Sequence, residues 1–202
     1  MTDAWLCMVR LSGALAARDA LRVRGELELA VGLCDPDEVE EILLQSYLFL
    51  GYPVALTGLG TWREVSGRAA SLSYDEPTID FGGRGEALCR RVYGANYDAL
   101  RRNIAALHPS IDRWMVVEGY GKVLGRSGAR ADVREACIVG LLAVLDAQSQ
   151  LHSHLRGALA VGVSPEDVEE VLRAVETFMS EGAVERGRAT WEKVKERCSS
   201  TR

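Results

Sequence analysis

Apolar residues recur every three or four positions along most of the chain, and alternating runs of β-branched residues are missing. Because this spacing gathers apolar side chains on one face of a helix, the pattern predicts an all-α protein. Two helix starts are well marked, at Asp35-Pro36 and at Ser164-Pro165. Each combines a capping side chain, a proline at the first helical position and a carboxylate two residues later. We expect these helices to run to about Leu50 and Met179.

Glycine and proline set the other expected boundaries. Gly51-Tyr52-Pro53 is expected to break the first of these helices, because proline disfavours helical geometry in the preceding residue. The one obvious loop runs from Ser71 through Gly85, where glycine and polar residues accumulate. Helical patterns resume beyond it over 86–93, 97–107 and 111–124.

One stretch of the chain occurs twice. The run Asp35–Leu43 reappears 129 positions later as Ser164–Leu172, and Thr61-Trp62 reappears as Thr190-Trp191. Upstream, a spacing of 130 pairs Leu29–Gly32 with Leu159–Gly162 and also pairs Cys7 with Cys137. This self-similarity indicates an internal duplication of a helical unit of about sixty residues. We predict a first repeat over 1–65, a connecting loop with helices over 66–134, and a second repeat over 135–202.

Composition and charge exclude several partners. With 48% hydrophobic residues in 202, the chain can bury a sizeable core. A formal net charge of −5, with Lys and Arg scattered, supplies no basic face for nucleic acid and no polybasic patch for a membrane. The N-terminus lacks the basic segment of a secretion signal, and no apolar run approaches the roughly 20 residues of a membrane span. We therefore expect a cytoplasmic protein with no nucleic-acid and no membrane partner.

The five cysteines are widely spaced and include no C-x-x-C pair. This argues against both a secreted disulfide framework and a zinc knuckle. Cys7 and Cys137 lie in apolar helical stretches, so we expect both to be small buried side chains. A glycine-rich phosphate loop and a His/Asp/Glu cluster at metal-ligand spacing are also missing, so no cofactor and no metal are expected.

The run Gln150-Leu151-His152-Ser153-His154, continued by Gly162–Leu172, resembles the carboxymuconolactone decarboxylase family, which includes the AhpD-type alkylhydroperoxidases. The first repeat looks like the same family through Val39–Gln45 and Gly51-Tyr52-Pro53. The resemblance implies an all-helical AhpD-like fold that assembles into homo-oligomers. It implies a trimer for two-repeat members and a hexamer for single-repeat members, so we expect a trimer or hexamer here, with the trimer favoured.

The peroxidase branch of that family carries a Glu, a C-x-x-C pair and a His at fixed spacing. On this chain Glu135 and His154 match the outer positions, whereas Ala147 and Gln150 occupy the two cysteine positions. Peroxide reduction by thiols requires a low-pKa nucleophilic thiolate and usually a resolving partner, and neither residue supplies sulfur. We predict that the protein is not a thiol peroxidase.

The resemblance then leaves His154 and Glu135 as an acid–base pair of the decarboxylase kind. Histidine suits proton transfer near neutral pH, and a neighbouring carboxylate fixes its tautomer. The resemblance implies a cofactor-free lyase that removes CO₂ from a small carboxylated lactone and protonates the resulting carbanion. His152 lies about 200° around the helix from His154, so the two imidazoles do not share a face.

Four further residues are candidates for substrate binding: Gln150, Arg134, Tyr120 and Glu118. Either Arg134 or Arg156 is a candidate to hold the substrate carboxylate. Glu118 and Tyr120 are candidates to line a pocket, because they adjoin Gly119 and Gly121 on an otherwise apolar helix. Close packing against another helix is the alternative explanation of the two glycines.

Each candidate also has a purely structural explanation. His154 can be a hydrogen-bonded histidine where helices pack, and Glu135 can complement a helix dipole. The pairs Glu40-Glu41 and Glu169-Glu170 look like solvated helix faces. Two classes of function therefore stay open, an acid–base enzyme and a non-catalytic oligomeric AhpD-like module. The sequence names neither the substrate nor whether the site lies within one chain or between subunits.

Overall fold

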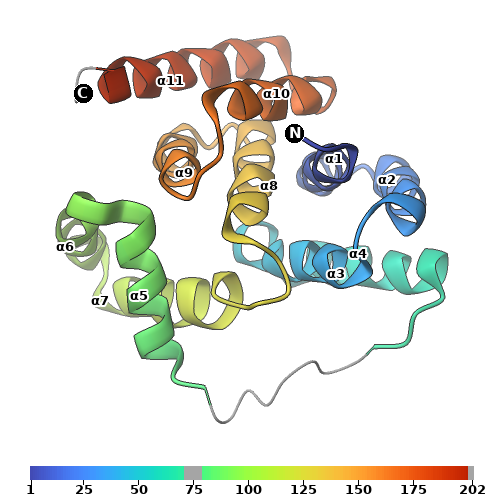
Figure 1. The fold of residues 1–202 in the computed structure, drawn as a ribbon, viewed down its shortest axis with the longest axis horizontal. Coiled ribbons are helices and arrows are strands. Elements are labelled where there is room, and N and C mark those ends of the chain that lie inside the picture. The colour runs from blue at the N-terminus through green and yellow to red at the C-terminus, as the bar shows by residue number, and fades with distance from the viewer. Residues whose placement is uncertain (71–78, 200–202) are drawn as a thin grey trace. The chain divides into compact units, whose positions relative to one another are not determined.

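The computed structural model describes residues 1–70 and 79–199. Within them the secondary structure is helical with no strand, as the apolar spacing predicts. The chain divides into two compact units, one made of residues 1–68 and 128–202 and the other of residues 69–127 (Figure 1). The two outer segments of the chain therefore fold together, and the middle segment forms its own unit.

The first unit contains two successions of four α-helices. The N-terminal succession consists of α1 (Asp3–Ala17), α2 (Ala20–Leu33), α3 (Pro36–Gln45) and α4 (Tyr47–Ser66). The C-terminal succession consists of α8 (Ala131–Val144), α9 (Gln148–Ala160), α10 (Pro165–Val175) and α11 (Glu181–Ser199), with the 3-10 turn η4 (Glu176–Phe178) before α11.

Helices α1 and α8 form the centre of this unit. Residues 133–143 of α8 are all buried, as are most residues of α1 from Cys7 onward. A helix that is apolar on every side must be covered on every side. Accordingly, α8 packs against α1, α9 and α10, and Figure 1 shows it passing between α9 and α1.

The predicted helix starts are confirmed. The side chain of Asp35 accepts a hydrogen bond from the Asp37 amide at 2.9 Å, and that of Ser164 accepts one from the Asp167 amide at 3.0 Å. Both helices end earlier than expected, α3 at Gln45 and α10 at Val175. The predicted break is confirmed at Gly51, whose φ of 79° and ψ of 168° interrupt α4. Glycine adopts this positive φ without the penalty of a Cβ.

The two successions share a side-chain contact. The indole Nε1 of Trp62 donates to Oε1 of Glu40 at 3.2 Å, and the indole of Trp191 donates to Oε1 of Glu169 at 3.3 Å. Each residue of the second pair lies 129 positions after its counterpart. The shared contact supports an internal duplication, which stays a prediction.

The register of the first hairpin differs from the sequence alignment. Arg18 and Asp146 both have a φ of 56° at the turns after α1 and α8. The same hydrogen bonds close both turns, from Arg18 and Asp19 in one and from Asp146 and Ala147 in the other. These turns are 128 positions apart, so the spacing of 130 is wrong here. Cys7 therefore corresponds to Glu135, and not to Cys137.

Glu41 corrects the prediction of a solvated face at Glu40-Glu41. Its side chain is buried and pairs with Arg134, Oε2 to Nη2 at 2.8 Å. Arg134 also donates to the Gln45 side chain and to the Ala129 carbonyl, both at 3.3 Å. This ion pair joins α3 to the first turn of α8.

The second unit consists of α5 (Phe81–Tyr93), η2 (Gly94–Asn96), α6 (Tyr97–Leu107), α7 (Pro109–Trp114) and the π-helix η3 (Met115–Leu124). The predicted loop is wrong at its end, because Gly82–Gly85 belong to α5. Asp80 caps that helix and accepts a hydrogen bond from the Gly83 amide at 3.0 Å. The earlier part of the predicted loop, Ser71–Thr78, lies outside the described residues.

The backbones of α5 and η3 come into close contact. A Cβ on Gly121 would lie 2.0 Å from the carbonyl oxygen of Phe81, and one on Gly85 would lie 2.0 Å from that of Val116. A Cβ on Gly119 would meet nothing within 4 Å. The packing explanation is therefore confirmed for Gly121 and wrong for Gly119.

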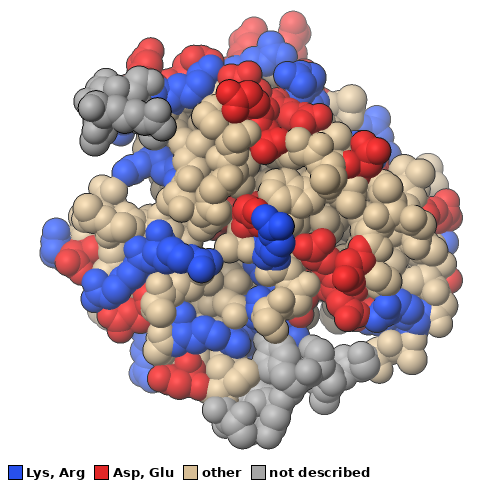
Figure 2. Space-filling model, in the orientation of Figure 1, with Lys and Arg blue, Asp and Glu red and all other residues tan. Residues whose placement is uncertain are grey.

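The charged side chains on the face in Figure 2 are of both signs and interspersed. In the part of the chain that the structure describes, no single helix combines the length and apolar character needed to cross a bilayer. Within the same residues, the pair of α3 and α4, bent by 118°, meets that requirement by length and composition.

Replacement of Arg134 by Met should lower the free energy of unfolding by about 3–5 kcal/mol, because it leaves the Glu41 carboxylate buried without its cation. The double variant Glu41→Leu/Arg134→Met removes both charges and should regain part of that loss. Urea denaturation of the three proteins measures the difference. Equal losses in the single and double variants would contradict this account of the pair.

Gly121→Ala should destabilise the protein by about 1–3 kcal/mol, because its methyl group collides with backbone that cannot move aside cheaply. Gly119→Ala is the matched control two residues away and should be neutral or stabilising by up to about 1 kcal/mol. Thermal and urea unfolding test both variants. Similar effects at the two positions would show that close backbone contact is not what requires Gly121.

Candidate functional site

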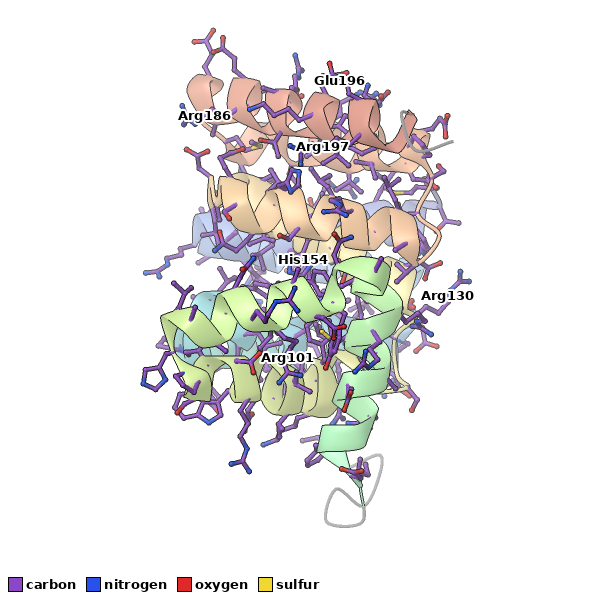
Figure 3. The ribbon with its side chains drawn as sticks, turned by 90° about the vertical axis from the view of Figure 1, so that its left-hand side faces the viewer. Arg101, Arg130, His154, Arg186, Glu196 and Arg197 are labelled. Atoms are coloured by element: carbon purple, nitrogen blue, oxygen red, sulfur yellow. The ribbon has the colours of Figure 1, made fainter. Side chains whose placement is uncertain are left out.

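The sequence candidates His154 and Glu135 meet inside the first unit. Figure 3 labels His154 on α9. Its Nδ1 lies 2.8 Å from Oε2 of Glu135, on α8. The exposed fraction is 8% for His154 and 4% for Glu135. The two side chains therefore form a buried acid–base dyad.

The α8–α9 turn brings the dyad together. Asp146 takes the left-handed conformation after α8, and α9 begins at Gln148. Glu135 lies 11 residues before Asp146 and His154 lies 8 residues after it, and the two side chains meet across the hairpin. Asp146 also binds the Arg186 guanidinium, with Nε 3.1 Å from each carboxylate oxygen, which ties the turn to α11.

The hydrogen bond defines which atoms remain available for chemistry. A carboxylate accepts hydrogen bonds, so Nδ1 of His154 carries the shared proton and Nε2 keeps a free lone pair in the neutral ring. Within the described residues, Nε2 of His154 and Oε1 of Glu135 have no hydrogen-bond partner. Because buried polar atoms usually have partners, these two atoms are the ones that a bound molecule would engage.

Phe49 adds an apolar side to the dyad. Its ring, from α4, meets the His154 ring edge-on with centroids 5.7 Å apart and an interplanar angle of 78°. The sequence analysis missed this residue, and its one local signal is its position two residues before the Gly51 break. No sequence pattern pairs it with a histidine 105 positions away.

The other predicted residues of this unit lie differently. Gln150 is exposed in the first turn of α9, and its spacing of four places it on the same face as His154. Arg134, although adjacent to Glu135, is committed to Glu41 on α3. Arg156 is exposed on α9. The structure thus brings together His154 and Glu135, with Gln150 one turn away.

Tyr120 and Glu118 belong to the second unit. The Tyr120 hydroxyl is 2.9 Å from that of Tyr93, and Tyr120 is buried whereas Glu118 is exposed. Their role in substrate binding stays a prediction.

His152 has different electrostatic surroundings from His154. Burial lowers its pKa, and the nearby cations Arg156, Arg197 and Lys193 lower it further. All of these effects favour the neutral ring. His152 is half-buried and lies on another face of α9 from His154.

The thiols near this hairpin are poorly suited to attack. Cys137, two residues after Glu135 on α8, is fully buried, and burial raises its pKa to about 12. Ala147 is the N-cap residue of α9, at one of the positions where the peroxidase branch carries cysteine. Within the described residues no group of three His, Cys, Asp or Glu side chains is arranged to hold a metal ion.

The first hairpin carries a different pair at the corresponding positions. Cys7 and Glu26 stand where Glu135 and His154 stand, and the Cys7 thiol contacts the Glu26 carbonyl at 3.4 Å. The carboxylate of Glu26 binds Arg10 Nε at 3.1 Å. The acid–base dyad therefore belongs to the second hairpin alone.

Comparison with known proteins identifies the same part of the chain. No curated protein matches the sequence significantly. Residues 113–191 match the carboxymuconolactone decarboxylase family, and the matched segment includes both Glu135 and His154. Through this segment, which is less than half of the chain, the protein is similar to the carboxymuconolactone decarboxylase family.

Proposed function

We propose that the protein is a cofactor-free lyase that decarboxylates a small carboxylated lactone by acid–base chemistry at His154. One observation carries the proposal: a buried histidine is held at Nδ1 by a buried carboxylate while its Nε2 has no partner within the described residues. This arrangement suits a group that must deliver or accept one proton at a fixed place.

The chemistry needs one proton and a place for one electron pair. As the bond between the ring carbon and the carboxylate breaks, CO₂ leaves and the electron pair remains on the ring, delocalised toward the lactone carbonyl. His154, protonated at Nε2, then delivers that proton to the ring carbon and becomes neutral with Nδ1–H toward Glu135. Solvent returns the proton to Nε2 after the product leaves.

Glu135 is proposed to act as a positioning residue. Its Oε2 is 2.8 Å from Nδ1, so the carboxylate fixes the ring and stabilises the charged imidazole before proton delivery. Gln150, one turn away on α9, is the candidate to bind the substrate. Arg134 does not carry this proposal, because its guanidinium already pairs with Glu41.

His154→Gln should lower turnover of an accepted lactone by about 10²–10⁴-fold, because the proton donor is lost. Glu135→Gln should give a smaller loss and change the pH profile of kcat, since the amide holds the ring without its charge. Ultraviolet loss and CO₂ release over a panel of carboxylated lactones provide the measurement. His152→Gln is the matched control and should retain turnover; a drop equal to that of His154→Gln would argue against the assignment.

The second candidate function is that of a non-catalytic oligomeric module. The contact between His154 and the Phe49 ring favours it, because this contact also fits a histidine that only joins helices. The same lactone assay distinguishes between the two functions. Folded wild-type protein that turns over no lactone, combined with a lower unfolding midpoint for His154→Gln, would support the module.

We also propose self-association through α2 and α4. Large apolar side chains are exposed on both helices, with exposed fractions of 85% for Leu21, 56% for Leu29, 66% for Tyr52 and 64% for Leu56. The two helices pack against each other, so these side chains lie on neighbouring elements. A second copy of the chain would remove this apolar surface from water.

Leu56→Glu should reduce the molar mass measured by light scattering toward that of one chain, because a charge in an apolar interface is not compensated. Leu107→Glu is the control, since Leu107 is 79% exposed on α6, in the other unit. Unchanged mass for Leu56→Glu, or the same decrease in both variants, would contradict an interface at α2 and α4.

A further inference from the structure

The acid–base dyad has an apolar cover on one side. The ring of Phe49 meets the His154 ring edge-on, with centroids 5.7 Å apart. Phe49 is half-buried, whereas His154 and Glu135 are both buried. Phe49 thus contacts the imidazole and also reaches solvent. A molecule that approaches the imidazole from this side must pass the phenyl ring.

The backbone that carries Phe49 is one short helical turn. It begins after Ser46, at the corner where α3 and α4 bend by 118°, and it ends at Gly51, whose φ of 79° and ψ of 168° are not helical. Within it, the amides of Phe49 and Leu50 donate to the Ser46 carbonyl at 3.1 and 2.9 Å. A single turn is marginally stable on its own, because few hydrogen bonds offset the entropy lost in ordering it. The turn over 47–50 therefore moves more easily than a long helix does.

A second aromatic contact holds this turn in place. The rings of Tyr47 and Tyr52 stack across the Gly51 break, with centroids 5.1 Å apart and an interplanar angle of 24°. A pair of this kind contributes modestly beyond the area that it buries. The turn is thus held over the dyad by contacts that are individually weak, which suits a segment that opens and closes.

We propose that Phe49 is a specificity-determining residue of the His154 site: its ring limits the site to flat ring compounds, and the turn over 47–50 opens to admit them. This proposal rests on the proposed function, because it concerns the ligand of the same dyad. A flat apolar ring can lie against the phenyl ring as aromatic pairs do. A branched group of similar size needs depth that the phenyl ring occupies.

The phenyl ring also orients a carboxylated ligand. The face of an aromatic ring is electron-rich, and a carboxylate buried against it has no hydrogen-bond donor. The ligand carboxylate therefore points away from Phe49, and the apolar part of the ligand lies beside Nε2 of His154. This orientation presents a ring carbon to the proton donor, as the proposed decarboxylation requires.

The experiment measures access to His154 and does not depend on turnover. Diethyl pyrocarbonate acylates a neutral imidazole at a nitrogen with a free lone pair, which in His154 is Nε2. The folded full-length chain is treated with this reagent and digested with trypsin. Fragmentation of peptide 135–156, which contains both His152 and His154, identifies the modified histidine. His152 is thus a reference within the same peptide.

Phe49→Ala should raise the rate of modification at His154 by about tenfold, because it removes the ring that covers the imidazole. Leu48→Ala is the matched control and should leave that rate unchanged, since Leu48 is also half-buried on the same turn but projects in another direction. The rate at His152 should be equal in all three proteins. Equal rates at His154 in wild type and Phe49→Ala would overturn the proposal.

Phe49→Leu decides the question if Phe49→Ala does not fold. Leucine keeps an apolar side chain at this position but is smaller than phenylalanine. A smaller increase at His154, with no change at His152, supports the proposal, and no increase contradicts it.

Protection by added ligands tests the limit on shape. Furoate is a flat carboxylated ring, and pivalate is a branched carboxylate of similar size. Furoate should slow the modification of His154 in wild type and pivalate should not, whereas both should slow it in Phe49→Ala. Protection of the wild-type protein by pivalate, or by neither compound, would show that Phe49 does not select flat rings.

The combined outcomes distinguish this proposal from the lyase proposal. Wild-type protein that turns over no lactone but is protected by furoate alone would remove the lyase and retain Phe49 as a selective cover. Turnover that depends on His154, combined with equal modification rates in wild type and Phe49→Ala, would retain the lyase and remove the role of Phe49.

Discussion

The rest of the structure depends on the packing of α1 against α8. Both helices are apolar on nearly every side, so neither is stable in water until the surrounding helices cover it. Helices from both ends of the chain meet this requirement together, which explains why residues 1–68 and 128–202 form one unit. A buried polar group on α8 must then find its partner within the unit, because water cannot supply one.

Two adjacent residues of α8 find such partners on two different helices. Arg134 is paired with Glu41 on α3, where the ion pair satisfies both charges and fixes one helix against another. Glu135 is paired with His154 on α9, where the carboxylate leaves one imidazole nitrogen uncommitted. The first contact holds α8 against α3. The second has the composition of a proton-transfer site, and Phe49 makes its surroundings less polar on one side.

The corresponding hairpins show how one backbone arrangement supports different chemistry. Both turns use the same left-handed residue and the same pair of backbone hydrogen bonds. The side chains facing across them are a carboxylate with an imidazole in one hairpin and a thiol with a backbone carbonyl in the other.

The sequence by itself determined the features that depend on neighbouring residues. Helical periodicity, the caps at Asp35 and Ser164 and the break at Gly51 are local, and the resemblance of the second hairpin to a family pattern selected His154 with Glu135 as candidates. Only the tertiary structure decided which helix faces meet. It buried Glu41, extended α5 over the glycines expected in a loop, shifted the hairpin register to 128 and placed Phe49 against His154. Such contacts join residues far apart in the chain, and their partners depend on how whole helices pack and not on any local pattern.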